Sequence, residues 1–234
     1  LSAVDENTIS VKQALNQIGY DGDIPCEPYP IHAYLELHIE QSTTLERTDN
    51  EVGIVSGVVG IDWLRVSITG AADHAGTTPI HARKDPMVTA STVVRNLKSL
   101  PSYLSEDIVA TVGKLRTQPG SINVIPEEIV FTVDIRCNED TKRNEAIDYL
   151  EHELKAATSR EGTTYDIERL MRSDSKEFSH SIRQSVREAC ELTGSHTQEM
   201  VSWATHDAMY VQKIGDAGMI FVPSVDGQSH SENE

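Results

Sequence analysis

The stretch IVFTVDIR, residues 129–136, alternates apolar and polar side chains with the two-residue period of a β-strand. Arg136 ends this run on the polar face, beside Asp134. A second run of similar type, 108–116, precedes it, and a segment with two prolines and one glycine, 117–128, joins the two. We therefore expect an antiparallel pair of strands whose apolar face packs in a core. That face consists of Ile129, Phe131, Val133 and Ile135.

Outward from this pair, the pattern predicts one further strand and one helix on each side. The order of elements along the chain is then strand–helix–strand–strand–helix–strand, which is the ferredoxin-like or split βαβ arrangement. Such a unit is α+β and spans about 110 residues. The added elements are a strand over 63–69, a helix over 86–100, a helix over 140–160 and a strand over 164–170.

The segments on either side of this unit have a different pattern. The nearly all-apolar run 218–223 is typical of a strand buried in an α/β sheet. We predict that residues 58–172 form the ferredoxin-like unit, inserted into an α/β domain made of 1–57 and 173–234. The other elements expected in that domain are a helix over 8–18 that ends at Gly19, a strand over 33–40, and helices over 178–193 and 206–214.

The composition limits the possible partners. The formal net charge of −17 argues against nucleic acid and anionic membranes, which both require clustered cations. No apolar run is long enough to span a membrane, and residues 1–15 lack the pattern of a signal peptide. The three cysteines are widely spaced, which favours neither a disulfide framework nor a metal clip. We expect a cytoplasmic protein.

Four of the nine histidines lie in suggestive surroundings. His38 lies between two glutamates on one face of a predicted strand, and His74 lies in a Gly-rich loop. His206 precedes an aspartate at a predicted helix start, and His230 follows the apolar run in a Gly/Ser loop. Loops at strand ends are where α/β sheets bind ligands. Each histidine alone is more often structural than functional.

Five motifs in a fixed order make the pattern specific. The motifs are HIEQ at 38–41, DHAGTTP at 73–79, GSINVIPEEIVFTVDIR at 120–136, THDAM at 205–209 and GQSHSENE at 227–234. Together they resemble the zinc-peptidase-like amidohydrolases that cleave ureido groups, namely allantoate amidohydrolase, N-carbamoyl-L-amino acid hydrolase and β-ureidopropionase. The resemblance covers nearly the whole chain, and HIEQ separates this group from its dipeptidase and aminoacylase relatives.

The resemblance implies an α/β catalytic domain of the zinc-aminopeptidase type with an inserted ferredoxin-like lid domain that also mediates dimerisation. It implies two divalent metal ions per complete subunit, either zinc or manganese, because the same ligands serve both. His38 and His230 match metal ligands of the family, and imidazole suits both metals.

The resemblance also implies a substrate site. Arg136 matches the arginine that binds the substrate carboxylate, with help from Asn123 and Gln41. His74 matches the catalytic lid histidine that polarises the scissile carbonyl, often across the dimer, and His206 matches a substrate-binding histidine. Two structural alternatives stay open: Arg136 could form an ion pair with Asp134 or another neighbour, and Asn123 could only shape its turn.

The chain departs from the family pattern in places. Trp203 and Thr205 replace two glycines of the family's turn before His206, which changes the pocket there. The family's first metal histidine, bridging aspartate and tandem glutamates have no matching candidate here. We therefore expect a fragment that lacks the N-terminal part of the catalytic domain and the extreme C-terminus. It should hold about half of a two-metal site and bind metal weakly or not at all.

These observations predict a hydrolase of linear amides. The parent protein is expected to use water activated by metal to cleave the ureido C–N bond of allantoate or an N-carbamoyl-L-amino acid, as a homodimer joined through the lid. A dipeptidase or aminoacylase of the same superfamily is the alternative among enzymes. If these residues are the whole protein, the alternative is a non-catalytic dimerisation or binding module.

Overall fold

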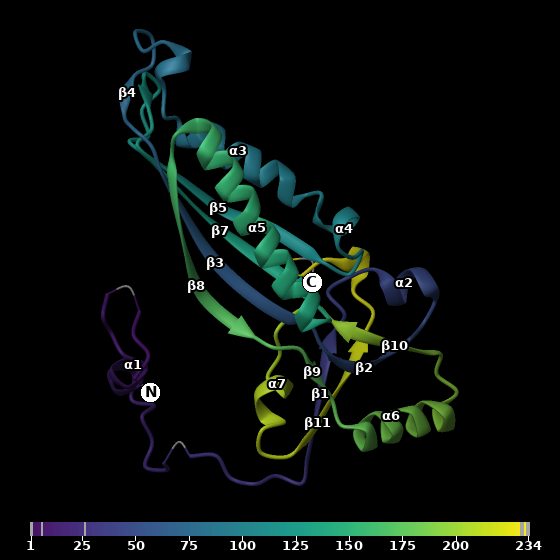
Figure 1. Ribbon diagram of the computed structural model, residues 1–234. Coiled ribbons are helices and arrows are strands. Elements are labelled where there is room, and N and C mark those ends of the chain that lie inside the picture. The colour runs from purple at the N-terminus through teal and green to yellow at the C-terminus, as the bar shows by residue number, and fades with distance from the viewer. Residues whose placement is uncertain (1, 6, 26, 230–231, 233–234) are drawn as a thin grey trace. The chain divides into compact units, whose positions relative to one another are not determined.

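The computed structural model describes residues 2–5, 7–25, 27–229 and 232. It divides into two compact units, Leu1–Ile31 and His32–Glu234. The first unit contains α1 (Val11–Ile18), the first helix in Figure 1. The sequence pattern predicts this helix from residue 8, but Ser10 is its N-cap and forms a capping box with Gln13, so the helix begins about one turn later.

The second unit contains two larger sheets. One is a four-stranded antiparallel sheet in the order β5-β7-β3-β8. Two long helices cover one of its faces and leave the other face open (Figure 1). This order and connectivity are those of the ferredoxin-like arrangement, as predicted. The elements are β3 (Gly60–Thr69), α3 (Pro86–Leu97), α4 (Leu100–Tyr103), β5 (Val109–Gln118), β7 (Glu128–Cys137), α5 (Asp140–Glu161) and β8 (Thr164–Ser173).

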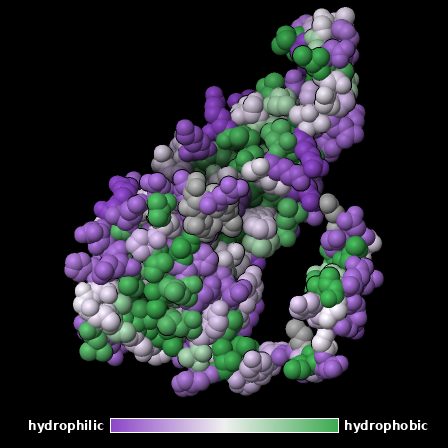
Figure 2. Space-filling model, turned by 180° about the vertical axis from the view of Figure 1, so that it is seen from behind, coloured by the Kyte–Doolittle hydropathy of each residue, from purple (hydrophilic) through white to green (hydrophobic). Residues whose placement is uncertain are grey.

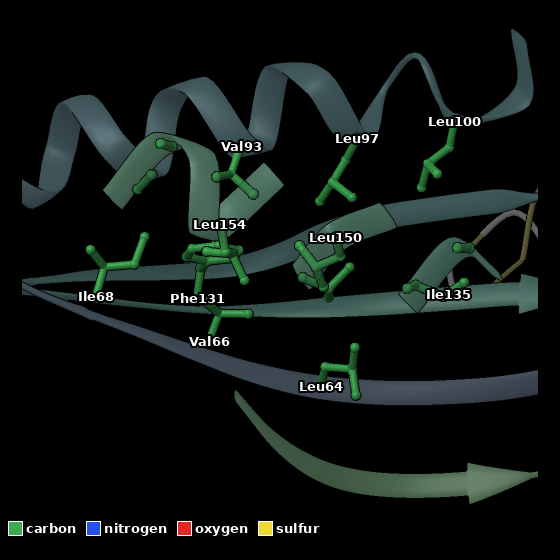
Figure 3. Packing of buried hydrophobic residues seen from close by; sticks show 14 of the residues in the cluster. Leu64, Val66, Ile68, Val93, Leu97, Leu100, Phe131, Ile135, Leu150 and Leu154 are labelled. Atoms are coloured by element: carbon green, nitrogen blue, oxygen red, sulfur yellow. The ribbon is translucent and has the colours of Figure 1, made fainter. Parts of the chain in front are cut away.

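The core of this sheet lies between its covered face and the two helices (Figure 3). Phe131 and Ile135 on β7 are fully buried, as the alternation predicted. Leu64, Val66 and Ile68 of β3 face the same core. Helix α3 contributes Val93 and Leu97, and α5 contributes Leu150 and Leu154.

The other sheet has five strands in the order β1-β11-β2-β10, with β9 paired to β2. The predicted buried strand is β11, which lies between parallel β1 and antiparallel β2. The chain leaves this sheet for the four-stranded sheet at Val59 and returns between Ser173 and Lys176. The elements are β1 (Ala33–Ile39), α2 (Thr44–Thr48), β2 (Val52–Val58), β9 (Lys176–Glu177), α6 (His180–Thr193), β10 (Thr197–Ser202), α7 (Ala208–Val211) and β11 (Asp216–Val222).

Strands β2 and β10 were not predicted from the sequence. The run 52–58 contains two glycines, which are unfavourable in isolated strands. Packing requires them here, because a Cβ at Gly53 would lie 2.6 Å from Met200 Sδ and one at Gly57 would lie 2.2 Å from the Lys176 carbonyl oxygen. The glycines therefore allow neighbouring strands and side chains to approach β2 closely.

Two helix predictions were too long. The helix expected over 86–100 ends at Leu97, and Pro101 lies in the first turn of the separate α4. The helix expected over 206–214 has only the four residues of α7. Its first backbone amide, that of Ala208, donates to the Glu36 carboxylate of β1, so a tertiary contact sets where it begins.

Hydrophobic side chains gather over the five-stranded sheet on the face seen in Figure 2. Leu35 and Leu37 of β1 are 50% and 68% exposed. Beside Leu35, a cavity of about 320 Å³ has an almost wholly apolar wall that includes Ile182 and Val186 of α6. Within the described residues, no helix is long and apolar enough to cross a membrane.

Candidate active site

The end of β1 carries His38. Its register partner on β11 is Phe221, and the two rings lie 6.4 Å apart between centroids. His38 Nδ1 lies 2.8 Å from the carbonyl oxygen of Ile39, and because a carbonyl only accepts, the hydrogen lies on Nδ1. The tautomer with this hydrogen has its lone pair on Nε2, which is the atom through which such a ring binds a metal ion.

The two glutamates that flank His38 have structural roles. Glu36 accepts a hydrogen bond of 2.7 Å from the backbone amide of Ala208 at the start of α7. Glu40 accepts from the backbone amides of Thr44 and Leu45 at the start of α2, and from the Ser42 hydroxyl. Both carboxylates thus satisfy amides at helix starts that would otherwise lack partners.

The environment of Glu40 also shifts its ionisation. Burial alone would raise the pKa of its carboxyl group, but the hydrogen bonds from Ser42, Leu45 and Thr44 outweigh that effect. The pKa of Glu40 consequently lies below its usual value, and the side chain is ionised at neutral pH.

His206 lies beside His38 and is only 5% exposed. The two imidazole rings meet edge to face with centroids 4.7 Å apart, and His206 Nε2 lies 2.7 Å from the Ser202 hydroxyl. Burial, with a smaller contribution from His38, lowers the pKa of His206 to about 4, so the ring is neutral at pH 7. The predicted substrate-binding histidine is therefore packed against the predicted metal ligand.

A cavity of about 570 Å³ lies next to this pair and brings Arg136 of β7 together with Gln41. Phe221, which contacts both histidines, also lines it. Gln41 has a positive φ of 61°, and its backbone amide donates to the Ser224 hydroxyl at 2.8 Å. The other described lining residues are Glu40, Ser42, Thr44, Gln198, Glu199, Met200, Val201, Trp203, Ala204 and Ser229.

Arg136 is held by two groups. Its Nε and Nη2 donate to the two carboxylate oxygens of Asp134, at 2.9 Å and 2.8 Å, and its Nη1 donates to the backbone carbonyl of Trp203. The ion pair foreseen as an alternative from the sequence is thus present. The ion pair does not bury the guanidinium, because the Arg136 side chain lines the cavity and is 28% exposed.

His74 and Asn123 lie together at the other end of the four-stranded sheet. The short strands β4 (Asp73–His74) and β6 (Val124–Ile125) form a two-stranded ribbon there (Figure 1). The amide of Ala75 donates to the carbonyl of Asn123, which joins the two predicted motifs. The ribbon follows the Thr69 end of β3, whereas Arg136 pairs with Ile61 at the opposite end, about 25 Å away along the strand.

The loop of His74 has a defined conformation. His74 Nδ1 accepts hydrogen bonds from the backbone amides of Gly76 and Thr77, at 3.1 Å and 3.2 Å. Arg83 donates to the carbonyls of Thr78 and Ala75 and so closes the loop. Because Nδ1 accepts, the neutral ring carries its hydrogen on Nε2, which makes that atom a donor.

The described residues contain no group of three or more His, Cys, Asp or Glu side chains that could hold a metal ion. His38 fits a metal by its tautomer, whereas its carboxylate neighbours are occupied at helix starts. The second predicted ligand, His230, lies outside the described residues. Among the described residues, the candidate metal site therefore consists of the imidazole of His38.

The residues that hold Arg136 in place were not predicted from the sequence as part of the site. Asp134 was considered only as a possible ion-pair partner, and Trp63, whose indole Nε1 donates to it at 3.0 Å, was not considered as part of the site. The two-residue period of the strand could have indicated Asp134, because it places Asp134 and Arg136 on the same face. Trp63 could not be found in this way, because its position opposite Asp134 depends on the register between two strands, which is a tertiary property.

Comparison with known proteins agrees with the motifs. The family model for peptidase family M20/M25/M40 matches residues 5–234. The chain is 36% identical over 241 residues to an N-carbamoyl-L-amino-acid amidohydrolase of Pseudomonas sp. (strain NS671), covering 100% of this chain and 58% of that protein. It is 31% identical to an allantoate amidohydrolase of Bacillus subtilis (strain 168), covering 98% of this chain and 56% of that protein.

Solved structures give the same result. An amidase of the hydantoinase/carbamoylase family from Burkholderia vietnamiensis superposes with a TM-score of 0.90 and 34% identity, over 99% of this chain and 56% of that one. AtUAH, solved in complex with glyoxylate, superposes with a TM-score of 0.87 and 26% identity, over 97% and 56% of the two chains. The chain thus spans somewhat over half the length of these relatives, and it belongs to peptidase family M20/M25/M40.

Proposed function

We propose that the protein is a metal-dependent amidohydrolase that cleaves the ureido C–N bond of an N-carbamoyl-L-amino acid or of allantoate. The observation that carries this proposal is the cavity that Arg136 and Gln41 both line. Phe221 also lines it and packs against His38 and His206. A cationic fork suits a substrate carboxylate. Relatives of these two activities, and the glyoxylate complex of AtUAH, support a small carboxylate as ligand.

In this proposal, the chain's own residues bind and orient the substrate. Arg136 and Gln41 hold the carboxylate, with Asn123 as a further donor. His38 binds a metal through its free Nε2, and His230 is the second ligand. A pair of zinc or manganese ions, when bound, lowers the pKa of water so that it can attack at neutral pH.

His74 has the role of an electrophilic donor. Its Nδ1 accepts two backbone hydrogen bonds, so its Nε2–H is available to the carbonyl oxygen of the ureido group. A preorganised donor of this kind stabilises negative charge as it develops on that oxygen. The proposed substrate-binding histidine, His206, is neutral and buried against His38, maintains the arrangement of the imidazoles, and packs against Phe221, which lines the cavity.

The placement of His74 and Asn123 favours a homodimer. Within one chain they lie at the opposite end of the four-stranded sheet from Arg136, so a second copy must bring them to the site. Charged side chains protect an edge strand from pairing, and β8 carries four of them whereas β5 carries two, Lys114 and Arg116. Strand β5, with Val109 and Leu115 exposed, is the edge we propose for antiparallel pairing with its copy.

We expect the 234-residue chain to sediment as a dimer and the Leu115→Lys variant to sediment as a monomer. Leu115 lies near the middle of β5, where a two-fold axis would place the two added lysines close to each other and to Lys114. Leu170→Lys, on the opposite edge strand, is the matched control and should remain a dimer. A wild-type chain that sediments as a monomer over the whole accessible concentration range would contradict the pairing.

The proposed location is the cytoplasm, and no nucleic acid or membrane is expected as a partner. Cys137 and Cys190 are free and buried, which fits a reducing compartment. The net charge of −17 is unfavourable for binding polyanions.

An activity panel tests the proposed function. The protein is prepared with whatever sequence its gene encodes on either side of these residues, stripped of metal, and supplied with zinc or manganese. We expect release of ammonia from N-carbamoyl-L-amino acids or allantoate, and loss of that activity on chelation. Turnover of dipeptides or N-acyl amino acids with no reaction of any ureido compound would instead identify a peptidase or aminoacylase.

A further inference from the structure

Asp134 and Arg136 form a two-point contact on the open face of the four-stranded sheet. They are two residues apart on β7, so both side chains project to that face, away from the covering helices. The carboxylate binds the guanidinium along one edge, through Nε and Nη2. Both side chains are a little over one-quarter exposed, so the pair lies at a boundary between protein and solvent.

Trp63 fixes the carboxylate in turn. It is the register partner of Asp134 on β3, and its indole Nε1 donates to Asp134 Oδ2 at 3.0 Å. The same oxygen accepts from Arg136 Nη2 at 2.8 Å. Trp63, Asp134 and Arg136 therefore form a continuous chain of hydrogen bonds across two strands.

The contacts leave a defined part of the guanidinium free. Of its five N–H groups, Asp134 takes the one on Nε and one on Nη2, and the Trp203 carbonyl takes one on Nη1. One N–H on each terminal nitrogen has no protein partner among these contacts. Both of these N–H groups are available to the oxygen atoms of a ligand such as a carboxylate.

An orienting partner matters because an arginine side chain at a partly exposed position has many rotamers. Holding an ion pair in one geometry costs side-chain entropy, which is why many exposed pairs are weak. A rigid indole donor on the neighbouring strand restricts the carboxylate, and the carboxylate restricts the guanidinium. The side-chain entropy of Arg136 is then lost during folding, so that little more is lost when a ligand binds.

We propose that Trp63 and Asp134 are positioning residues that orient Arg136, so that its two remaining N–H groups are held ready to bind a carboxylate in the cavity that Arg136 lines. This inference rests on the proposed function, in which Arg136 binds the substrate carboxylate. Trp63 acts entirely through Asp134, and its contribution is to the affinity for the carboxylate and not to the bond-breaking step.

The test uses the ¹⁵N-labelled 234-residue chain and N-carbamoylglycine as the probe. Trp63→Phe removes the indole donor but preserves the ring and every charge around Arg136. We expect hydrogen exchange at Arg136 Nε–H to accelerate about threefold or more, and the Kd for the probe to rise about three- to tenfold, as for loss of one hydrogen bond. With two tryptophans in the chain, the indole N–H signals are assigned by Trp63→Phe and Trp203→Phe.

Two controls separate the possible explanations. Leu170→Ala alters the apolar cavity beside Trp63 without removing the hydrogen bond, and it should leave both readouts within about twofold of wild type. Arg136→Met should abolish probe binding. If Trp63→Phe leaves either the exchange rate or the affinity unchanged, the positioning role is wrong.

Failure of the underlying function gives a different result. If the wild-type chain and Arg136→Met have the same affinity for the probe, or if neither binds it, Arg136 is not the carboxylate anchor in this chain. Exchange at Arg136 Nε–H is measured without ligand, so it still decides whether Trp63 restrains the guanidinium.

Discussion

The Arg136→Lys variant of the proposed amidohydrolase is expected to have a KM for an N-carbamoyl-L-amino acid about 30-fold or more above that of the wild type. Lysine keeps the charge but lacks the planar fork, and it cannot be held along one edge by Asp134 while it binds a ligand with the other. The value of kcat should change little, because the carboxylate lies away from the scissile bond and its binding energy is the same in ground and transition states.

A steady-state comparison on one N-carbamoyl-L-amino acid measures this effect. Arg65→Lys is a suitable control, because Arg65 lies on the same face of the sheet but pairs with Glu168 and does not line the cavity. Its KM should equal that of the wild type. If the KM of Arg136→Lys is unchanged, Arg136 does not bind the substrate carboxylate. If only kcat falls, Arg136 acts on the reacting atoms and not on the carboxylate.

The second large effect expected is on stability, from Arg143→Met. Arg143 and Asp62 are both fully buried, and Arg143 Nε donates to Asp62 at 2.7 Å. Asp140 and Asp174 bind its terminal nitrogens, so this arginine joins the start of α5, β3 and the segment that returns to the other sheet. Removing the cation leaves the buried Asp62 carboxylate with only the partly exposed Arg169, at 3.0 Å, and Arg172, at 4.0 Å. This loss should lower the free energy of unfolding by about 3 kcal/mol.

Urea unfolding measures this change. Arg65→Met breaks an exposed ion pair with Glu168 and should cost less than about 1 kcal/mol. The double variant Asp62→Leu/Arg143→Met removes both buried charges and should recover part of the loss. If Arg143→Met is as stable as the wild type, the buried ion pair does not hold this junction together.

The sequence determined the ferredoxin-like unit to within a few residues. The alternation at 129–136 is a local pattern, and a strand with one buried face needs only that pattern to be assigned its orientation. Helix α5 was likewise predicted almost to its ends, because its N-terminal and C-terminal signals lie next to it in the chain.

Elements whose limits depend on distant groups were not predictable. Strand β2 contains glycines because Met200 and Lys176 pack against it, and α7 begins where Glu36 of β1 accepts its first amide. No local signal reports either contact. The physical reason is that packing and capping from another part of the chain override the intrinsic preference of a short segment.

The candidate site divides in the same way. Motif resemblance in the sequence predicted site roles for His38, Gln41 and Arg136. In the structure, Gln41 and Arg136 line one cavity, and His38 packs against Phe221, which also lines it.

Only the tertiary structure decided how the surrounding groups are used. Both glutamates beside His38 cap helices, and Trp63 and Asp134 hold Arg136. It also placed His74 at the far end of β3 from Arg136. Residue types and spacing define which chemistry a side chain can perform. Which partner takes each of its hydrogen bonds depends on strand register and sheet order, and these are set by contacts between segments that lie far apart in the chain.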